Sequence, residues 1–384
     1  MHVSTIERIE TFMVAPRWLF VRIATADGLV GWGEATLEGY CEPVRAAVTQ
    51  FAEYLVGKDA SHIEDHWQIL TKGGFYRGGA VLASAVSGVD QALWDLAGKR
   101  VGLPVHDLLG GRVRDKIRVY GWVGGDDPNE VSDAIAAQLE VGLTAVKMNA
   151  SGRISANASV AEIDGVLGRV AAAREVLGEH RDVAVDFHGR FTLANARRIA
   201  PLLEPLRPFF IEEPVVPENS HLIGKLVDLT SIPIATGERL YNRQEFLPVL
   251  AAGIAVAQPD LSHAGGISET RRIAALAEAY DVQLAPHCPL GPIALAACLQ
   301  VGFATPNYLI QEQSIGIHYN QGAEVLDYVV DKTPLDFADG FIHRLTGPGL
   351  GIEVDEAAVR AADKIGHSWR TPVWRHDTGA FAEW

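Results

Sequence analysis

Short apolar runs, each ending in a titratable residue, recur through the second half of the chain. The last residues of these runs are, in chain order, Asp186, Glu212, Glu238, Asp260, His287 and Glu312. They are separated by 26, 26, 22, 27 and 25 residues, which leaves room for one helix and two loops between strands. Two similar runs upstream, 117–120 and 145–149, raise the number of predicted strands to eight. This alternation predicts an α/β fold in which parallel strands close into a barrel.

The helical pattern between these strands is clearest in two segments. Asp127, Pro128 and Glu130 stand in the order expected of an N-cap, a first-turn proline and a capping box. Apolar residues then recur at helical spacing in 131–139 and again in 163–177. We therefore expect one helix after each of the first two barrel strands.

The beginning of the chain follows a different pattern. Two runs typical of strands, 19–25 and 29–33, flank Asp27-Gly28, which is typical of a hairpin turn. Apolar stripes at helical spacing follow in 44–55 and 81–96. Strands followed by helices predict an α+β arrangement, separate from the alternating region.

This change of pattern divides the chain into domains. We expect an α+β domain over 1–115 and a barrel domain over 116–339. The segment 340–384 is rich in Gly, Pro, Trp and His, and we expect it to join the first domain by folding back on it.

Composition and charge narrow the class of protein. The chain has 384 residues, of which 48% are hydrophobic, enough to build a full core. It has no run of 18 uninterrupted apolar residues and no basic start followed by an apolar stretch, so we expect neither a membrane span nor a secretion signal. Three cysteines without metal-ligand spacing fit reduced thiols in the cytoplasm. A net charge of −15 argues against nucleic acid or an anionic membrane as a partner.

The three acids spaced 26 residues apart are the first candidates for chemistry. Asp186, Glu212 and Glu238 would end three consecutive parallel strands and meet at the carboxyl end of the barrel, where barrel enzymes place their active sites. Carboxylate oxygens are the ligands that Mg²⁺ prefers, and such a site keeps positions open for substrate oxygens. We therefore expect Mg²⁺ at this face.

Histidines flank the predicted metal site. His188 lies two residues after Asp186, and on an extended strand the two side chains would point to the same side. Asp260 and His287 end neighbouring strands, and a carboxylate bonded to an imidazole raises its basicity. Alternatively, His188 is an ordinary loop histidine and Asp260 caps the turn that follows it. A metal between two histidines suits abstraction of a proton next to a carboxylate.

Two charged neighbours of the acids receive supporting roles. Glu213 directly follows Glu212, should point the other way, and is expected to pair with a nearby base. Arg239 follows Glu238 and is expected to orient the metal ligands without binding the metal itself. The sequence contains no GxSxG, HExxH, CxxC or P-loop pattern, which excludes several classes of enzyme.

Seven segments give the chain a resemblance to a known family. They are 16–18, 74–79, 186–190, 210–214, 258–266, 285–292 and 311–320. In order and spacing they resemble the enolase superfamily, and within it the mandelate racemase subgroup, over essentially the whole chain. The resemblance implies a modified TIM barrel, (β/α)7β, with an N-terminal α+β capping domain.

The resemblance also implies roles for individual residues in a Mg²⁺-dependent sugar-acid dehydratase. Asp186, Glu212 and Glu238 would hold the metal. His287, supported by Asp260, would remove the proton from carbon 2 of the substrate. His188 would protonate the departing 3-hydroxyl, and Glu312 would steady the ene-diolate. The substrate-binding residues it implies are Arg17, Trp18, Tyr76, Arg77, Lys147, Asn149 and His318.

One departure from the subgroup narrows the reaction. Its racemases carry Lys-x-Lys on the second barrel strand, and the second lysine is a base; this chain has Lys147-Met148-Asn149. Asn149 cannot serve as a base, so racemisation is disfavoured, whereas elimination needs one base and one acid. A metal-dependent hydrolase is also disfavoured, because the first strand carries Tyr120-Gly121-Trp122 in place of His-x-His.

The resemblance is closest to members that act on D-galactonate, which we expect as the substrate. Another aldonate or aldarate is the alternative, and a catalytically silent sugar-acid binder is a more distant one. We expect a cytoplasmic homo-oligomer whose partner is a small sugar acid, and neither nucleic acid nor membrane.

Overall fold

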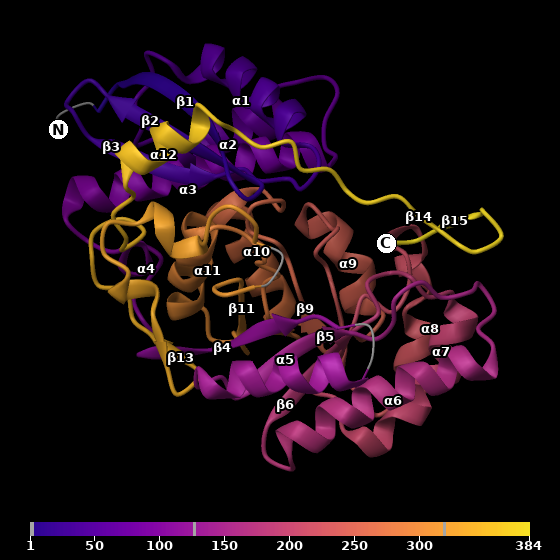
Figure 1. Cartoon of the computed structure of the whole chain (residues 1–384). Helices are drawn as coiled ribbons and strands as arrows, with labels where there is room; N and C mark the ends of the chain where they lie inside the picture. Colours follow the sequence, from indigo (N-terminus) through magenta and orange to yellow (C-terminus); the bar gives the residue numbers. More distant parts are fainter. Residues whose placement is uncertain (1–3, 126–127, 318–319) are drawn as a thin grey trace.

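The computed structural model describes residues 4–125, 128–317 and 320–384, and two regions meet face to face in it (Figure 1). The first contains a three-stranded antiparallel sheet in the order β1 (Ile6–Val14), β2 (Trp18–Thr25) and β3 (Val30–Glu34). Its helices are α1 (Cys41–Leu55), α2 (Ile63–Lys72), α3 (Ala80–Val101) and α4 (Val105–Leu108). The predicted hairpin and the two predicted helical stripes are confirmed. Strand β1 was not predicted, because its charged residues break the two-residue alternation typical of a strand.

The second region is a ring of parallel strands. The strands are β4 (Lys116–Val123), β5 (Ala145–Asn149), β6 (Asp182–Asp186), β7 (Ile211–Glu212), β8 (Ile234–Thr236), β9 (Val256–Ala257), β10 (Gln283–Leu284) and β11 (Gln311–Gln313). They pair in chain order from β4 to β10, and β11 pairs with β4. A parallel bridge between Leu284 and Tyr308 links the segment before β11 to β10 and closes the ring. All eight predicted strands are confirmed.

Helices connect the strands along the outside of the barrel (Figure 1). They are α5 (Pro128–Glu140), α6 (Val160–Leu177), α7 (Leu193–Leu203), α8 (Gly224–Val227), α9 (Arg243–Ala251), α10 (Gly266–Glu278) and α11 (Pro292–Ala304). Short 3-10 helices are η1 (Glu204–Leu206), η2 (Pro217–Leu222), η3 (Val325–Tyr328) and η4 (Thr333–Leu335). The order of seven strand–helix units and a final strand is the (β/α)7β arrangement. Asp127, the predicted N-cap of α5, lies outside the described residues.

The interior of the barrel is filled by a mixture of small and large apolar side chains. One buried layer combines Ala145, Ala184, Ala235 and Ala285 with larger residues from the other strands. Strand register then aligns residues at the carboxyl ends: Asn149 pairs with Asp186, and Asp186 pairs with Glu212. The sequence therefore places polar side chains in one row above an apolar layer.

Two buried acids of the first region join it to barrel helices. Glu34 accepts hydrogen bonds from the main-chain N–H groups of Gly291 (2.9 Å) and Ala294 (3.0 Å) at the start of α11. Asp90 accepts one from the N–H of Ser268 (3.0 Å) at the start of α10. These carboxylates satisfy helix N–H groups that have no partner within the helix, and so fix the first region against the barrel.

The last part of the chain makes contact with both regions. Strand β13 (Phe341–His343) pairs antiparallel with β4 at the edge of the barrel sheet, and β12 (Phe337–Ala338) pairs antiparallel with β13. Helix α12 (Glu356–Asp363) then packs against β1, as expected of a segment that folds back. The hairpin of β14 (Trp374–Arg375) and β15 (Phe381–Ala382) lies instead beside the barrel (Figure 1). No helix in the described part of the chain is long and apolar enough to cross a membrane.

Candidate active site

The three predicted metal ligands lie at the ends of three adjacent strands. Asp186 and Glu212 are the last residues of β6 and β7, and Glu238 follows β8 by two residues. Asp186 and Glu212 are fully buried, and the side chain of Glu238 is 11% exposed. Burial raises the pKa of each carboxyl to about 7, although nearby cations oppose the shift. These carboxyls therefore lie in a buried environment that disfavours their charged forms unless a cation is near.

Lys147, on β5, is the main cation inside this group. Its Nζ lies 2.6 Å from Glu212 Oε1 and 2.8 Å from Glu312 Oε1, and all three side chains are buried. Burial acts to lower the pKa of Lys147, but the two carboxylates outweigh it and raise the pKa well above its ordinary value. Lys147 is thus a permanent positive charge that joins one predicted metal ligand to one predicted catalytic residue.

Gln258 is a site residue that sequence reasoning did not single out. Its Nε2 donates to Glu212 Oε2 at 2.7 Å, so both oxygens of Glu212 are engaged by protein donors. Among the described residues, no group of three or more His, Cys, Asp or Glu side chains is arranged to hold a metal ion as it stands. Gln258 could have been found in the segment Gln258-Pro259-Asp260, of which we singled out only Asp260.

Asp260 and His287 form a buried pair. His287 Nδ1 lies 2.8 Å from Asp260 Oδ2, and His287 Nε2 lies 3.6 Å from Glu238 Oε2. Burial acts to lower the pKa of His287, but the carboxylates of Glu238, Glu312 and Asp260 raise it well above its ordinary value. The alternative expectation also holds, since Asp260 Oδ1 accepts from the N–H of Ser262 in the following turn.

Glu312 lies close to two positive groups, Lys147 and His287. It is buried, which acts to raise its pKa, but Lys147 and His287 hold the pKa below its ordinary value. Its Oε2 accepts a hydrogen bond from the N–H of Cys288 at 2.9 Å. Glu312 is therefore ionised in this structure and would have to take up a proton before it could donate a hydrogen bond.

His188 is placed differently from the expected geometry. Strand β6 ends at Asp186, and His188 lies in the following turn with φ of 52°, so the argument from an extended strand is wrong. Its N–H donates to Asp186 Oδ1 at 2.6 Å, and its Nδ1 lies 2.8 Å from the main-chain oxygen of Trp384. Burial, followed by Arg190 and Arg239, lowers the pKa of His188 well below its ordinary value. The main chain of His188 is therefore bonded to Asp186 within a turn, and its imidazole is bonded to Trp384.

The two supporting residues behave as expected. Glu213 pairs with Arg239, whose Nη2 lies 2.5 Å from Glu213 Oε2, and Glu213 also accepts from Thr236 Oγ1 at 2.5 Å. Arg239 Nε lies 3.9 Å from Glu238 Oε1. This arginine thus links the ligand candidate Glu238 to a structural acid.

Four residues of the first region were expected at the substrate. Arg17 is buried, and its guanidinium bonds Glu38 Oε1 (2.6 Å), Asn320 Oδ1 (3.0 Å) and the Pro289 oxygen (2.8 Å), so it ties the first region to two barrel loops. Trp18 is fully buried in the apolar core, with its ring stacked on Phe20, because both faces of β2 are covered. Trp18 therefore packs in the core, while its Nε1 is buried without a hydrogen-bond partner among the described residues, and its contact with substrate stays a prediction.

Tyr76 and Arg77 lie in an exposed loop. Tyr76 is 88% exposed, and Arg77 Nε donates to the oxygen of Gly74 at 2.9 Å within the same loop. Both line a cavity of about 510 Å³ between the first region and the loop after β8. Tyr241, three residues after Glu238, also lines it, whereas none of the three predicted metal ligands does.

Of the remaining predicted substrate contacts, Asn149 has a notable environment. Its Oδ1 is buried without a hydrogen-bond partner among the described residues. A buried amide oxygen in this state is free to accept a bond from a ligand hydroxyl. His318 lies outside the described residues.

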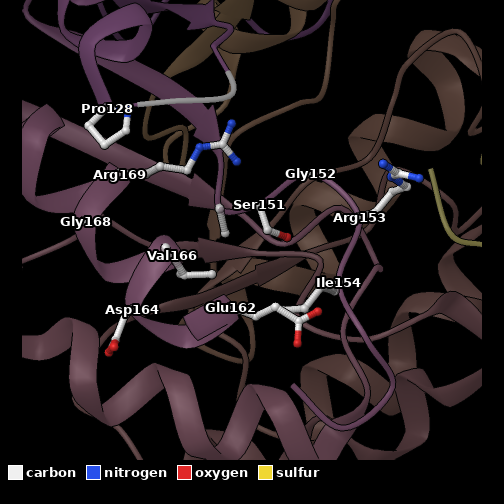
Figure 2. Close-up of a pocket in the computed structure, with 12 residues that line it drawn as sticks. Pro128, Ser151, Gly152, Arg153, Ile154, Glu162, Asp164, Val166, Gly168 and Arg169 are labelled. Atoms are coloured by element: carbon white, nitrogen blue, oxygen red, sulfur yellow. The ribbon is translucent and has the colours of Figure 1, made fainter. Parts of the chain in front are cut away.

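A second cavity, of about 340 Å³, is lined by the loop after β5 and by α6, and none of the predicted site residues lines it (Figure 2).

Comparison with known proteins agrees with this architecture. Residues 9–110 match the model of the mandelate racemase / muconate lactonizing enzyme N-terminal domain, and residues 130–358 match the enolase C-terminal domain-like model. The chain belongs to the enolase superfamily. The resemblance found in the seven sequence segments is thereby confirmed.

Relatives match this member of the superfamily over nearly its whole length. It is 52% identical to D-galactonate dehydratase of Variovorax paradoxus and 50% identical to that of Pectobacterium atrosepticum, in each case over 99% of this chain and 100% of the relative. Among solved structures, an enolase from Agrobacterium radiobacter bound to Na and L-malate superposes with a TM-score of 0.90 at 34% identity, covering 99% of this chain and 100% of that chain.

Proposed function

We propose that this protein is a Mg²⁺-dependent dehydratase that converts D-galactonate to 2-dehydro-3-deoxy-D-galactonate and water. The observation that carries the proposal is the arrangement of an oriented base, His287 with Asp260, and a second histidine, His188, around buried carboxylates. Relatives named D-galactonate dehydratase, at 50–52% identity, support the choice of substrate.

The carboxylates fit a divalent cation. Asp186, Glu212 and Glu238 offer only oxygen donors, which Mg²⁺ prefers. Burial raises their pKa values to about 7, and a bound cation would favour their ionised forms. When bound, Mg²⁺ would supply positive charge to stabilise the negative charge that develops on the substrate carboxylate. Lys147 adds a second, permanent positive charge beside the same acids.

His287 is the proposed base. Asp260 Oδ2 accepts a hydrogen bond from the Nδ1–H of His287, so Nε2 is the nitrogen left to take the proton from carbon 2. Glu238 contributes to the raised pKa of His287, so a cation that neutralises Glu238 also brings this histidine nearer to its unprotonated, basic form.

His188 is the proposed acid. Burial and the positive charges of Arg190 and Arg239 lower its pKa, so once protonated it releases its proton readily to the departing 3-hydroxyl. Asn149, with its unpartnered Oδ1, is proposed to accept a hydrogen bond from a substrate hydroxyl. Glu312, ionised here, is proposed to steady the substrate through Lys147, and directly only after it takes up a proton.

We also propose the division into a capping domain of residues 1–115, joined by 340–384, and a barrel domain of 116–339. The separate hydrophobic core within residues 6–96 supports this division, and α12 packs against β1 of that part. The helix caps made by Glu34 and Asp90 cross the boundary, and they predict that the two parts unfold together.

The experiment that tests the proposed function is an assay of aldonate and aldarate salts for keto-acid formation with added Mg²⁺. D-galactonate should give the highest kcat/KM. If the protein dehydrated a different aldonate or aldarate, the proposed reaction would stand and the proposed substrate would be wrong. If the protein bound sugar acids with Mg²⁺ present but formed no keto acid from any of them, it would be a binding protein and the proposal would be wrong.

A further inference from the structure

The segment 367–384, here called the strap, connects the first region to the loops at the end of the barrel. At its start, His367 Nε2 lies 3.3 Å from the oxygen of Trp18. Its hairpin is held by Arg190, whose guanidinium lies 4.7 Å from the centre of the Trp374 ring, and by Arg153, which donates to the main-chain oxygen of the residue after Trp374. The strap is thus attached to the loops that follow β5 and β6 (Figure 1).

The strap ends on the imidazole of His188. The main-chain oxygen of Trp384 lies 2.8 Å from His188 Nδ1. The Trp384 ring meets the imidazole edge to face, with centroids 5.5 Å apart and planes at 90°. Trp369, earlier in the strap, lies against Trp384 with ring centroids 6.1 Å apart. Trp384 therefore contacts His188 through both its main chain and its side chain.

These two contacts have separate consequences for the imidazole. A main-chain oxygen can only accept, so the Nδ1 atom of His188 must carry the proton in this bond. That assignment leaves Nε2 as the ring nitrogen available to exchange a proton with a ligand. The edge-to-face contact with the indole restricts rotation of the ring about its Cβ–Cγ bond.

We propose that Trp384 is a positioning residue for His188, and that the strap serves to present it. The main-chain oxygen fixes the Nδ1–H form of the imidazole, and the indole holds the ring so that Nε2 reaches the departing hydroxyl. This inference rests on the proposed role of His188 as the acid in dehydration. Asp260 orients His287 in the same way, from the segment that follows β9.

The test uses the full enzyme with Mg²⁺ and D-galactonate in D₂O, and it follows two rates. One is the exchange of the carbon-2 proton with solvent, which depends on the base. The other is keto-acid formation, which depends on the acid as well. A variant that ends at Glu383 should form keto acid about 10²-fold more slowly while it keeps its exchange rate within a few-fold. Trp384→Ala, which keeps the main-chain oxygen, should lose less, and Trp384→Phe should be close to native.

Phe381→Ala is the matched control, because Phe381 is 61% exposed in the same hairpin. It should leave both rates unchanged. Native dehydration by the shortened variant would overturn the inference. So would an equal fall of both rates in all Trp384 variants, because that result would show a general structural role.

A second readout needs no turnover. In protein labelled with ¹⁵N-histidine, the His188 signals, identified by their absence in His188→Asn, should show the Nδ1–H form in the native protein and lose it in the variant that ends at Glu383. An unchanged form would contradict the inference. If the native protein formed no keto acid, the proposed function would fail, while this spectrum would still decide whether Trp384 fixes the imidazole.

Discussion

The carboxylate of Asp260 orients His287 and closes a turn at the same time. Its Oδ2 accepts from His287 Nδ1 at 2.8 Å, and its Oδ1 accepts from the N–H of Ser262 at 2.7 Å. Because the turn fixes the carboxylate, the carboxylate can fix the imidazole. The direction of His287 is thus set by the main chain that follows β9.

This relationship predicts how proton removal from carbon 2 slows when His287 or Asp260 is replaced. His287→Asn should abolish exchange of the carbon-2 proton with solvent deuterium, because no other group takes that proton. Asp260→Asn should slow exchange and dehydration together by about 10²- to 10⁴-fold, because the imidazole loses its orientation and part of its basicity. Glu278→Gln, on the outer surface at the end of α10, is the control. Normal exchange in His287→Asn would show that the base is misassigned.

His188→Asn should separate proton removal from loss of the hydroxyl. The variant lacks the acid but keeps His287 and Asp260, so exchange at carbon 2 should continue while keto acid is not formed. A 3-fluoro analogue should still eliminate, because fluoride leaves with less help from an acid. Exchange followed by NMR and product measured as keto acid give both rates, and unimpaired dehydration would rule out His188 as the acid.

The buried carboxylates predict an unusual dependence of stability on pH. The pKa values of Asp186, Glu212 and Glu238 are raised to about 7 in the folded protein, from ordinary values of 3.8 and 4.5. At pH values between the ordinary pKa and the raised pKa, the folded protein binds more protons than the unfolded chain. In EDTA, the free energy of unfolding should therefore fall as the pH rises through this range. Thermal unfolding at several pH values measures this, and a melting temperature that rises across the window would contradict it.

Mg²⁺ should counteract this loss. It competes with protons for the same oxygens, so it should raise the melting temperature more at about pH 8 than at about pH 5.5. Glu34 and Asp90, whose pKa values burial also raises to about 7, contribute to the pH slope in EDTA but not to the Mg²⁺ effect. Glu238→Gln should reduce the Mg²⁺ effect, and an unchanged effect would place the metal elsewhere.

Lys147 should be required for folding stability as well as for activity. Lys147→Met removes the cation shared by Glu212 and Glu312 and leaves two buried carboxylates without it. Breaking a buried pair in this way costs about 3–5 kcal/mol, so the urea midpoint should fall clearly. Lys225→Met, at an exposed position, is the control and should leave it unchanged. An unchanged midpoint for Lys147→Met would mean that the carboxylates are neutral without it.

The sequence was sufficient to predict the barrel, because each buried parallel strand is an apolar run and most of these runs end in a titratable residue. It could not place Lys147 against Glu212, since that contact depends on the register between β5 and the strands beyond it. The burial of Trp18 could not be predicted either, because a motif near a loop does not reveal that both faces of β2 are covered. The strap has no periodicity, so its contact with His188 appears only in three dimensions.

The most direct test of the proposed function follows D-galactonate and, separately, D-gluconate by ¹H NMR in D₂O with the protein and Mg²⁺. The two acids differ at carbon 4, so only groups that meet the 4-hydroxyl can distinguish them, and a site with a buried unpaired partner can reject the wrong one by on the order of 10⁴. For D-galactonate we expect the carbon-2 signal to disappear and a carbon-3 signal with one deuterium to appear, far faster than for D-gluconate. No change with either acid, or faster reaction of D-gluconate, would contradict the proposed function.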